Sequence, residues 1–120
     1  MQESVKELHK LLEFYDEVRD VLDDIENIKE MILQSNYNKE KIVSIESKYS
    51  IETNFLMKFE NSEKIGFKNN YEDADLQVLL NLRDRLYYIA IYKILKSQGR
   101  ELPKEFLQKD YSELINLIAK

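Results

Sequence analysis

Only three residues of this chain are strong helix breakers: Gly66, Gly99 and Pro103. Glycine and proline are the residues that most often interrupt helices, so the long stretches without either favour long helices. Apolar residues also recur at three- and four-residue steps, which is the spacing of one helix face. We therefore predict an all-α fold, a bundle of about four helices with a long N-terminal helix.

The length of 120 residues fits one domain, and we expect residues 1–120 to form a single helical domain. No apolar run approaches the roughly 20 residues of a membrane span, and the N-terminus lacks an export signal. The expectation is a cytoplasmic protein that does not contact the membrane. Because the chain has no cysteine, disulfides, thiolate catalysis and cysteine-ligated zinc are excluded.

The N-terminal segment predicts one continuous amphipathic helix that ends near Ser35 and Asn36. Ser4 and Glu7 have the spacing of a capping box at its start. The apolar stripe is wide enough to need two neighbouring helices. Its members are Leu8, Leu11, Tyr15, Val18, Leu22, Ile25 and Ile32, widened by Phe14, Val21 and Ile28.

The second segment, residues 39–64, fits two periodicities. Its spacing is helical, but residues 49–57 also alternate as a strand would. We predict a helix, because no hairpin turn and no second strand are available for pairing. A break near Ser50 is compatible with the pattern. Gly66 is expected to end this segment, before a loop over residues 68–71.

The third predicted helix begins near Asn70 and Asp73 and stops at Gly99. Its apolar positions cover more than half of its circumference. Such a helix is either central in the bundle or half-covered by another chain, which makes a homodimer plausible.

The last part of the chain predicts one short helix. Pro103 suits a first helical turn, and the sequence from Asp110 to Glu113 suits the cap of an amphipathic stretch that ends at Ile118.

The net charge of −5 conceals a gradient along the chain. Residues 1–35 hold ten acidic and four basic side chains, whereas residues 76–109 hold seven basic and three acidic ones. In an antiparallel bundle these segments attract each other. An acidic protein repels nucleic acid at long range, which disfavours direct nucleic-acid binding.

Arg83 is the first candidate for a binding residue, because the third helix places it among apolar side chains. A guanidinium there needs a carboxylate of the acidic first helix or a partner protein. The opposite side of that helix carries Arg85, Tyr88 and Tyr92. Exposed tyrosine beside arginine is typical of binding hot spots, although a last helix could also cover this face.

The first segment carries an acidic face that could dock on a basic protein surface. Its members are Glu13, Asp16, Glu17, Asp20, Asp23 and Asp24. His9, one turn before Glu13, predicts a solvated salt link. A di-iron bundle site is excluded, because Lys6 stands where that site needs a glutamate.

Two local resemblances suggest enzyme families. Glu60 and Glu63, followed by Glu72 and Asp75, resemble the ExxE and ExxD motifs of all-α nucleoside-triphosphate pyrophosphohydrolases of the MazG type. That resemblance implies Mg²⁺ held between two helices, where it would polarise a phosphorus centre. The two pairs stand closer together here than is usual in that family.

The stretch from Arg85 to Tyr92, continuing to Gly99, is similar to a helix of HEPN-type domains over less than a quarter of the chain. The nuclease motif of that family is an arginine followed four to six residues later by a histidine. No histidine follows Arg83 or Arg85, so the resemblance implies a HEPN-like domain without nuclease activity.

No dense polar constellation or specific catalytic motif appears in the sequence, so the predicted function is non-catalytic. We expect a small protein–protein interaction module, a subunit or an inhibitor or regulator of a larger microbial or phage-related complex, with no cofactor or metal. Its partner is another protein or a second copy of the chain. The candidate partner-binding residues are Arg83, Arg85, Tyr88, Tyr92, Asp16, Asp20, Asp23 and Asp24. The alternatives are the Mg²⁺-dependent hydrolase and the HEPN-like domain.

Overall fold

A computed structural model describes residues 2–59 and 74–119 of the chain. These two ranges contain helices and no strand, which confirms the all-α prediction for the described part. The α-helices are α1 (Gln2–Leu12), α2 (Arg19–Leu33), α3 (Lys39–Lys48), α4 (Ser50–Phe59), α5 (Ala74–Ser97) and α6 (Tyr111–Ala119), with short 3₁₀ turns η1 (Asp16–Val18) and η3 (Phe106–Gln108).

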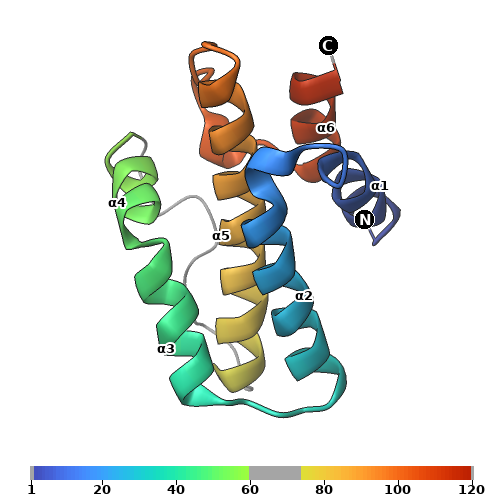
Figure 1. Cartoon of the computed structure of the whole chain (residues 1–120), viewed down its shortest axis with the longest axis vertical. Helices are drawn as coiled ribbons and strands as arrows, with labels where there is room; N and C mark the ends of the chain where they lie inside the picture. Colours follow the sequence, from blue (N-terminus) through green and yellow to red (C-terminus); the bar gives the residue numbers. More distant parts are fainter. Residues whose placement is uncertain (1, 60–73, 120) are drawn as a thin grey trace.

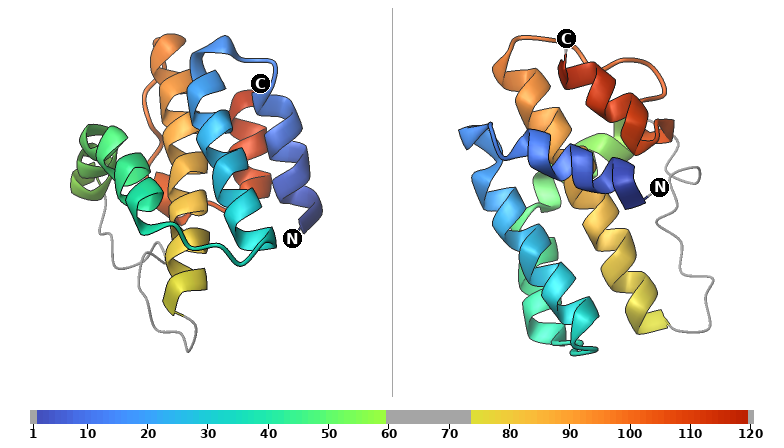
Figure 2. Two further views of the ribbon diagram at one scale, coloured as in Figure 1. Left: turned by 60° about the horizontal axis from the view of Figure 1, so that its bottom comes forward. Right: turned by 90° about the vertical axis from the view of Figure 1, so that its right-hand side faces the viewer.

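Helix α5 runs through the middle of the molecule, as Figures 1 and 2 show. Helix α2 packs antiparallel along one side of α5 and makes the most extensive contact with it. Helices α3 and α4 follow one another along the other side, and α1 pairs with α6. Within the described residues, no helix has both the length and the apolar character needed to cross a membrane.

The broadly apolar α5 is buried by helices of its own chain. Its fully or almost fully buried side chains are Leu79, Leu82, Leu86, Tyr87, Ile89, Ala90, Ile91, Ile94 and Leu95. Two faces of one helix are therefore covered at once, by α2 and by α3 and α4. The central position that the sequence allowed for this helix is the one that it takes.

The prediction of one long N-terminal helix is wrong, because the chain breaks between Leu12 and Asp16. At about 100° per residue, a continuous helix would place Leu8 and Leu12 far around the circumference from Val21 and Ile25. All four side chains are fully buried. The break lets α1 pack on α6 while α2 packs on α5, so both apolar faces are covered.

The start of the N-terminal helix also differs from the prediction. Ser4 lies inside α1 rather than at its cap, and its Oγ is 3.0 Å from Oγ of Ser112 in α6. This hydrogen bond ties α1 to the helix on which it packs.

The second predicted segment divides at Tyr49, which confirms the break expected near Ser50 and excludes a strand over residues 49–57. Asn38 caps α3, its Oδ1 accepting the Lys41 backbone N–H at 3.1 Å. Because two predicted helices divide in two, the described residues form more helices than the four expected. The predicted end at Gly66, the loop over 68–71 and the helix start at Asn70 and Asp73 lie outside the described residues.

The predicted helix signals after α5 are confirmed at two of three positions. Gly99 has φ of 70°, and Arg100 N–H donates to the Leu95 carbonyl at 2.9 Å, so α5 ends in a Schellman motif. Asp110 and Glu113 form a reciprocal capping box with two bonds of 2.9 Å. Pro103 opens no helix, because Glu105 has φ of 59° and only the short η3 follows it.

Candidate interaction surfaces

Helix α4 carries exposed apolar side chains that the core does not use. Ile51 is 81% exposed and Phe55 is 43% exposed. They stand four residues apart, so they lie on one face of α4. Single exposed apolar residues are ordinary, but neighbouring ones are typical of binding surfaces.

Phe55 continues this face onto α5 and forms one wall of a groove. Its ring stacks on the Tyr92 ring with centroids 5.0 Å apart. A groove of about 480 Å³ opens between α4, the C-terminal end of α5 and the segment that follows α5. Its lining residues are Phe55, Tyr92, Lys96, Gly99, Arg100, Glu101 and Leu102. We call this site the α4–α5 groove.

Two cations stand at the α4–α5 groove. Lys96 Nζ lies 5.8 Å from the centroid of the Tyr92 ring. Arg100 donates through Nη2 to the Leu117 carbonyl of α6 at 2.9 Å, which fixes the segment after α5. Glu101 is the carboxylate among the lining residues. The groove is thus apolar inside, with a net positive edge.

The two tyrosines predicted to form one hot spot have different surroundings. Tyr92 lies in the α4–α5 groove, whereas Tyr88 is covered by the segment that contains η3. The Tyr88 hydroxyl donates to the Lys109 carbonyl, and its ring meets the Phe106 ring edge-on at 5.6 Å. Burial raises the pKa of Tyr88 to about 12. Tyr88 therefore has a structural role inside the chain.

An internal ion pair would have joined Arg83 to the acidic first segment, but Arg83 does not pair with any described residue of that segment. Its Nη2 lies 3.5 Å from Asp84 Oδ1 in the same helix, and its buried Nε has no hydrogen-bond partner among residues 2–59 and 74–119. Ser97 donates to Glu17 of η1 at 3.1 Å, which places Glu17 about 20 Å along α5 from Arg83. Glu26, farther along the acidic segment, pairs with His9 instead.

Arg85 is also enclosed by the fold. Burial lowers the pKa of its guanidinium, and the negative charge of Glu46 in α3 acts in the opposite direction. Arg85 therefore faces the α3 side of the bundle, where it is only partly accessible to a partner.

The acidic face of the first segment is divided by burial. Asp16, Asp20 and Asp23 are exposed, and Asp16 accepts from Arg19 at 2.8 Å. Asp24 is buried and accepts from the Tyr49 hydroxyl at 2.6 Å and from Lys48 Nζ at 3.1 Å. Burial and the bond to Asp24 raise the pKa of Tyr49. Asp24 thus joins α2 to the end of α3.

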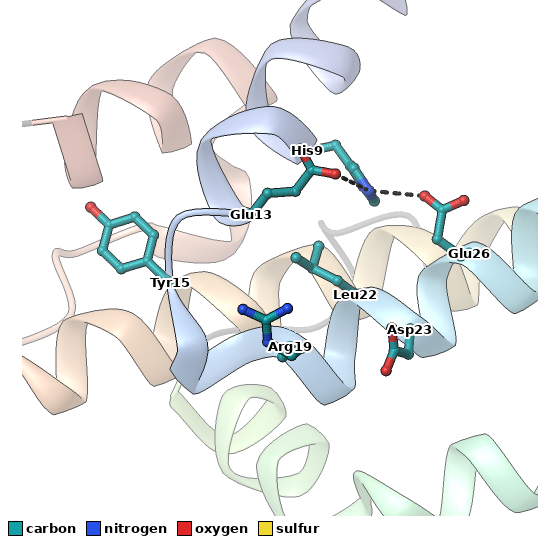
Figure 3. Close-up of a pocket in the computed structure, with 7 residues that line it drawn as sticks. All are labelled: His9, Glu13, Tyr15, Arg19, Leu22, Asp23 and Glu26. Carbon is teal, nitrogen blue, oxygen red and sulfur yellow. Dashed lines mark ion pairs between the residues drawn. The ribbon is translucent and has the colours of Figure 1, made fainter.

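A smaller pocket of about 260 Å³ lies between α1 and α2, shown in Figure 3. His9 Nε2 is 2.9 Å from Glu26 Oε2 and 4.0 Å from Glu13 Oε2. Nδ1 of the same ring is 3.0 Å from the hydroxyl of Tyr87 in α5. The remaining lining residues are Tyr15, Arg19, Leu22 and Asp23.

The prediction of a solvated salt link between His9 and Glu13 is wrong. The His9 side chain is only 12% exposed, and Glu26 is nearer to it than Glu13. A signal was present in the sequence. His9 stands four residues after Val5 and three before Leu12, which places it beside the apolar face of α1.

The residues of the pyrophosphohydrolase resemblance fall largely beyond the described ranges. Glu60, Glu63 and Glu72 lie outside the described residues, and Asp75 is exposed in the first turn of α5. Among residues 2–59 and 74–119, no group of three or more histidine, aspartate or glutamate side chains is placed to hold a metal ion.

Comparison with known proteins identifies no relative of this chain. No protein-family model, no curated protein and no solved structure matches it.

Proposed function

We propose that the protein is a small, non-catalytic cytoplasmic interaction module that binds an apolar, acidic segment of a partner protein in the α4–α5 groove. The observation that carries this proposal is the stacked pair of Phe55 and Tyr92 beside Lys96 and Arg100, with the exposed Ile51 one turn of α4 away from Phe55. Such a module would act as a subunit or as a regulator of a larger complex.

The apolar part of the groove supports helix-in-groove recognition. In that mode an amphipathic helix inserts side chains from successive turns into an apolar groove. Ile51 and Phe55 present one continuous ridge along α4, and Tyr92 and Leu102 line the groove beside it. Aromatic residues with a polar edge are enriched among the residues that dominate binding free energies.

The charge distribution supports an acidic partner. The chain as a whole carries a formal charge of −5, whereas Lys96 and Arg100 make the groove edge locally positive. An acidic segment is attracted to this edge and repelled at long range by the net negative charge of the chain, so the charges favour both an acidic partner and this site. A second copy of this acidic chain is disfavoured by the repulsion between two net negative charges.

Selection from a random 15-residue peptide display library against the immobilised protein tests this proposal. We expect enriched peptides to carry apolar residues three and four positions apart and a net negative charge. Ile51→Asp should abolish their binding. Leu33→Asp is the matched control, because Leu33 at the end of α2 is 84% exposed and Ile51 is 81% exposed.

Three results contradict the proposal. These are no enrichment, enrichment of basic peptides, and binding that survives Ile51→Asp. A concentration-dependent dimer that Ile51→Asp dissociates and Leu33→Asp does not would replace the foreign partner with a second copy.

A further inference from the structure

The only histidine of the chain joins three helices through one side chain. His9 belongs to α1, and its Nε2 faces Glu26 of α2 (Figure 3). Its Nδ1 faces the hydroxyl of Tyr87 in α5. The His9 ring also meets the Tyr87 ring edge-on, with centroids 6.1 Å apart. This site lies on α1, so its role does not depend on the α4–α5 groove.

Both hydrogen bonds fit a neutral imidazole. Tyr87 is fully buried, and burial raises the pKa of its hydroxyl to about 12, so that hydroxyl keeps its proton near neutral pH. It donates this proton to Nδ1, which leaves the hydrogen of His9 on Nε2. Nε2–H then donates to the Glu26 carboxylate. Every donor of the set has an acceptor in this state.

A second proton on His9 breaks this pattern. Nδ1–H and the Tyr87 hydroxyl would then be two donors facing each other. The Tyr87 oxygen can accept from Nδ1–H only if its own hydrogen turns away, and a hydroxyl hydrogen without an acceptor is costly in a fully buried position.

The charges around His9 act in both directions. Glu13 in α1 and Glu26 in α2 favour the protonated ring, whereas burial and Lys29 in α2 disfavour it. Burial is the largest of these effects, so the pKa of His9 lies below its ordinary value of 6.5. Three further groups lie near Tyr87. The charges of Arg83 and Asp84 in α5 affect the Tyr87 hydroxyl, and the ring of Tyr111 in α6, whose hydroxyl donates to Asp84, meets the Tyr87 ring edge-on.

We propose that protonation of His9 releases α1 from α2 and α5, which makes this side chain a pH-sensitive latch. Helix α1 has only 11 residues, and helices of that length are marginal without tertiary contacts. Its release exposes Leu8 and Leu12, which are fully buried in the latched state. Protonation of His9 thus exposes apolar surface that is buried when the ring is neutral.

Two measurements on the full chain test the latch. The imidazole resonances, which come from one residue only, report the His9 titration by NMR. Amide hydrogen exchange at about pH 7.5 and about pH 5, corrected for intrinsic rates, reports the protection of each helix. We expect a midpoint below 6.5 and a loss of protection in α1 that α2 does not share. That loss approaches about tenfold for each pH unit between the midpoint and 6.5.

Two variants separate the latch from general acid destabilisation. His9→Gln removes the titrating group, so α1 protection should no longer change between the two pH values. Tyr87→Phe keeps the ring and removes the hydroxyl, so the His9 midpoint should rise, because the neutral ring loses its donor. Tyr87→Phe also provides a test if His9→Gln does not fold.

The latch is refuted by a His9 midpoint at or above 6.5. It is also refuted if α1 keeps its protection at about pH 5, or if α1 is lost equally in the wild type and in His9→Gln. A midpoint that Tyr87→Phe leaves unchanged would show that the hydroxyl contact does not govern the titration.

Discussion

The α4–α5 groove and the His9 site differ in what the fold does with their side chains. In the groove, Ile51 remains 81% exposed, and Phe55 is stacked on Tyr92 with 43% of its surface exposed. At the other site, both nitrogens of His9 have partners and Tyr87 is fully buried. Apolar area left in water is available to stabilise a complex, whereas bonds already made inside stabilise the fold. The side chains of the α4–α5 groove are therefore available to a partner, whereas those of the His9 site stabilise the packing of the chain itself.

The largest expected difference between the two regions is in the free energy of unfolding. Leu12→Ala in α1 should lower it by about 2–5 kcal/mol, because Leu12 is fully buried and its truncation leaves a cavity. Ile51→Ala in α4 should change it by less than about 0.5 kcal/mol. Urea denaturation of both variants measures the comparison. Equal losses would mean that Ile51 is part of the core and is unavailable to a partner.

Two neighbouring acids provide the next test. Asp24→Ala should cost about 1–3 kcal/mol, because the Tyr49 hydroxyl loses its acceptor in a buried position. Asp23→Ala removes the same charge from an exposed position and should have an effect within about 0.5 kcal/mol. Denaturant midpoints of the two variants decide. If Asp23→Ala were the more damaging change, the division of the acidic face would be wrong.

Two local signals in the C-terminal part of the chain predicted helix boundaries correctly, because they act within one turn, whereas the capping box at Ser4 and the helix start at Pro103 were wrong. Gly99 and the Asp110–Glu113 pair each determine a helix boundary through their own backbone geometry. The broad apolar character of residues 76–94 likewise predicted a helix with neighbours on more than one side. None of these inferences needs to know which helix lies opposite.

The larger errors concern tertiary contacts, which the periodicity of the sequence does not determine. The break between Leu12 and Asp16 has no glycine or proline to mark it, and only the change in the direction of the apolar face indicates it. One expectation for Arg83 was an ion pair with the acidic first segment, but Arg83 lies nearest to Asp84 of its own helix, whereas Glu17 lies beside Ser97 and Glu26 pairs with His9. The alternation over residues 49–57, which includes Ile51 and Phe55, did not indicate that α4 leaves both of these side chains exposed.

A smaller effect on stability is expected from pH, and its sign follows from the pKa of His9. Burial lowers that pKa in the folded state, so the unfolded chain binds the proton more readily. The free energy of unfolding should therefore be fully retained above about pH 6.5 and should fall as pH drops toward the folded pKa. Each unit of pKa shift corresponds to about 1.4 kcal/mol. The difference between wild type and His9→Gln over this range isolates the contribution of His9 from that of the carboxylates.

The smallest expected change in stability, with a clear effect on binding, is at the edge of the groove. Lys96 is exposed, so Lys96→Glu should leave the free energy of unfolding within about 0.5 kcal/mol. Rim charges contribute little to stability but guide charged partners, so affinity for an acidic peptide selected on the groove should fall about two- to fivefold. Lys10→Glu on α1 makes the same change of net charge at an exposed position away from the groove. Titrations at low and high salt separate the two variants. At low salt the loss should be larger for Lys96→Glu, and high salt should reduce it by screening. Equal losses in both variants would show that net charge alone, rather than the edge of the α4–α5 groove, attracts the peptide.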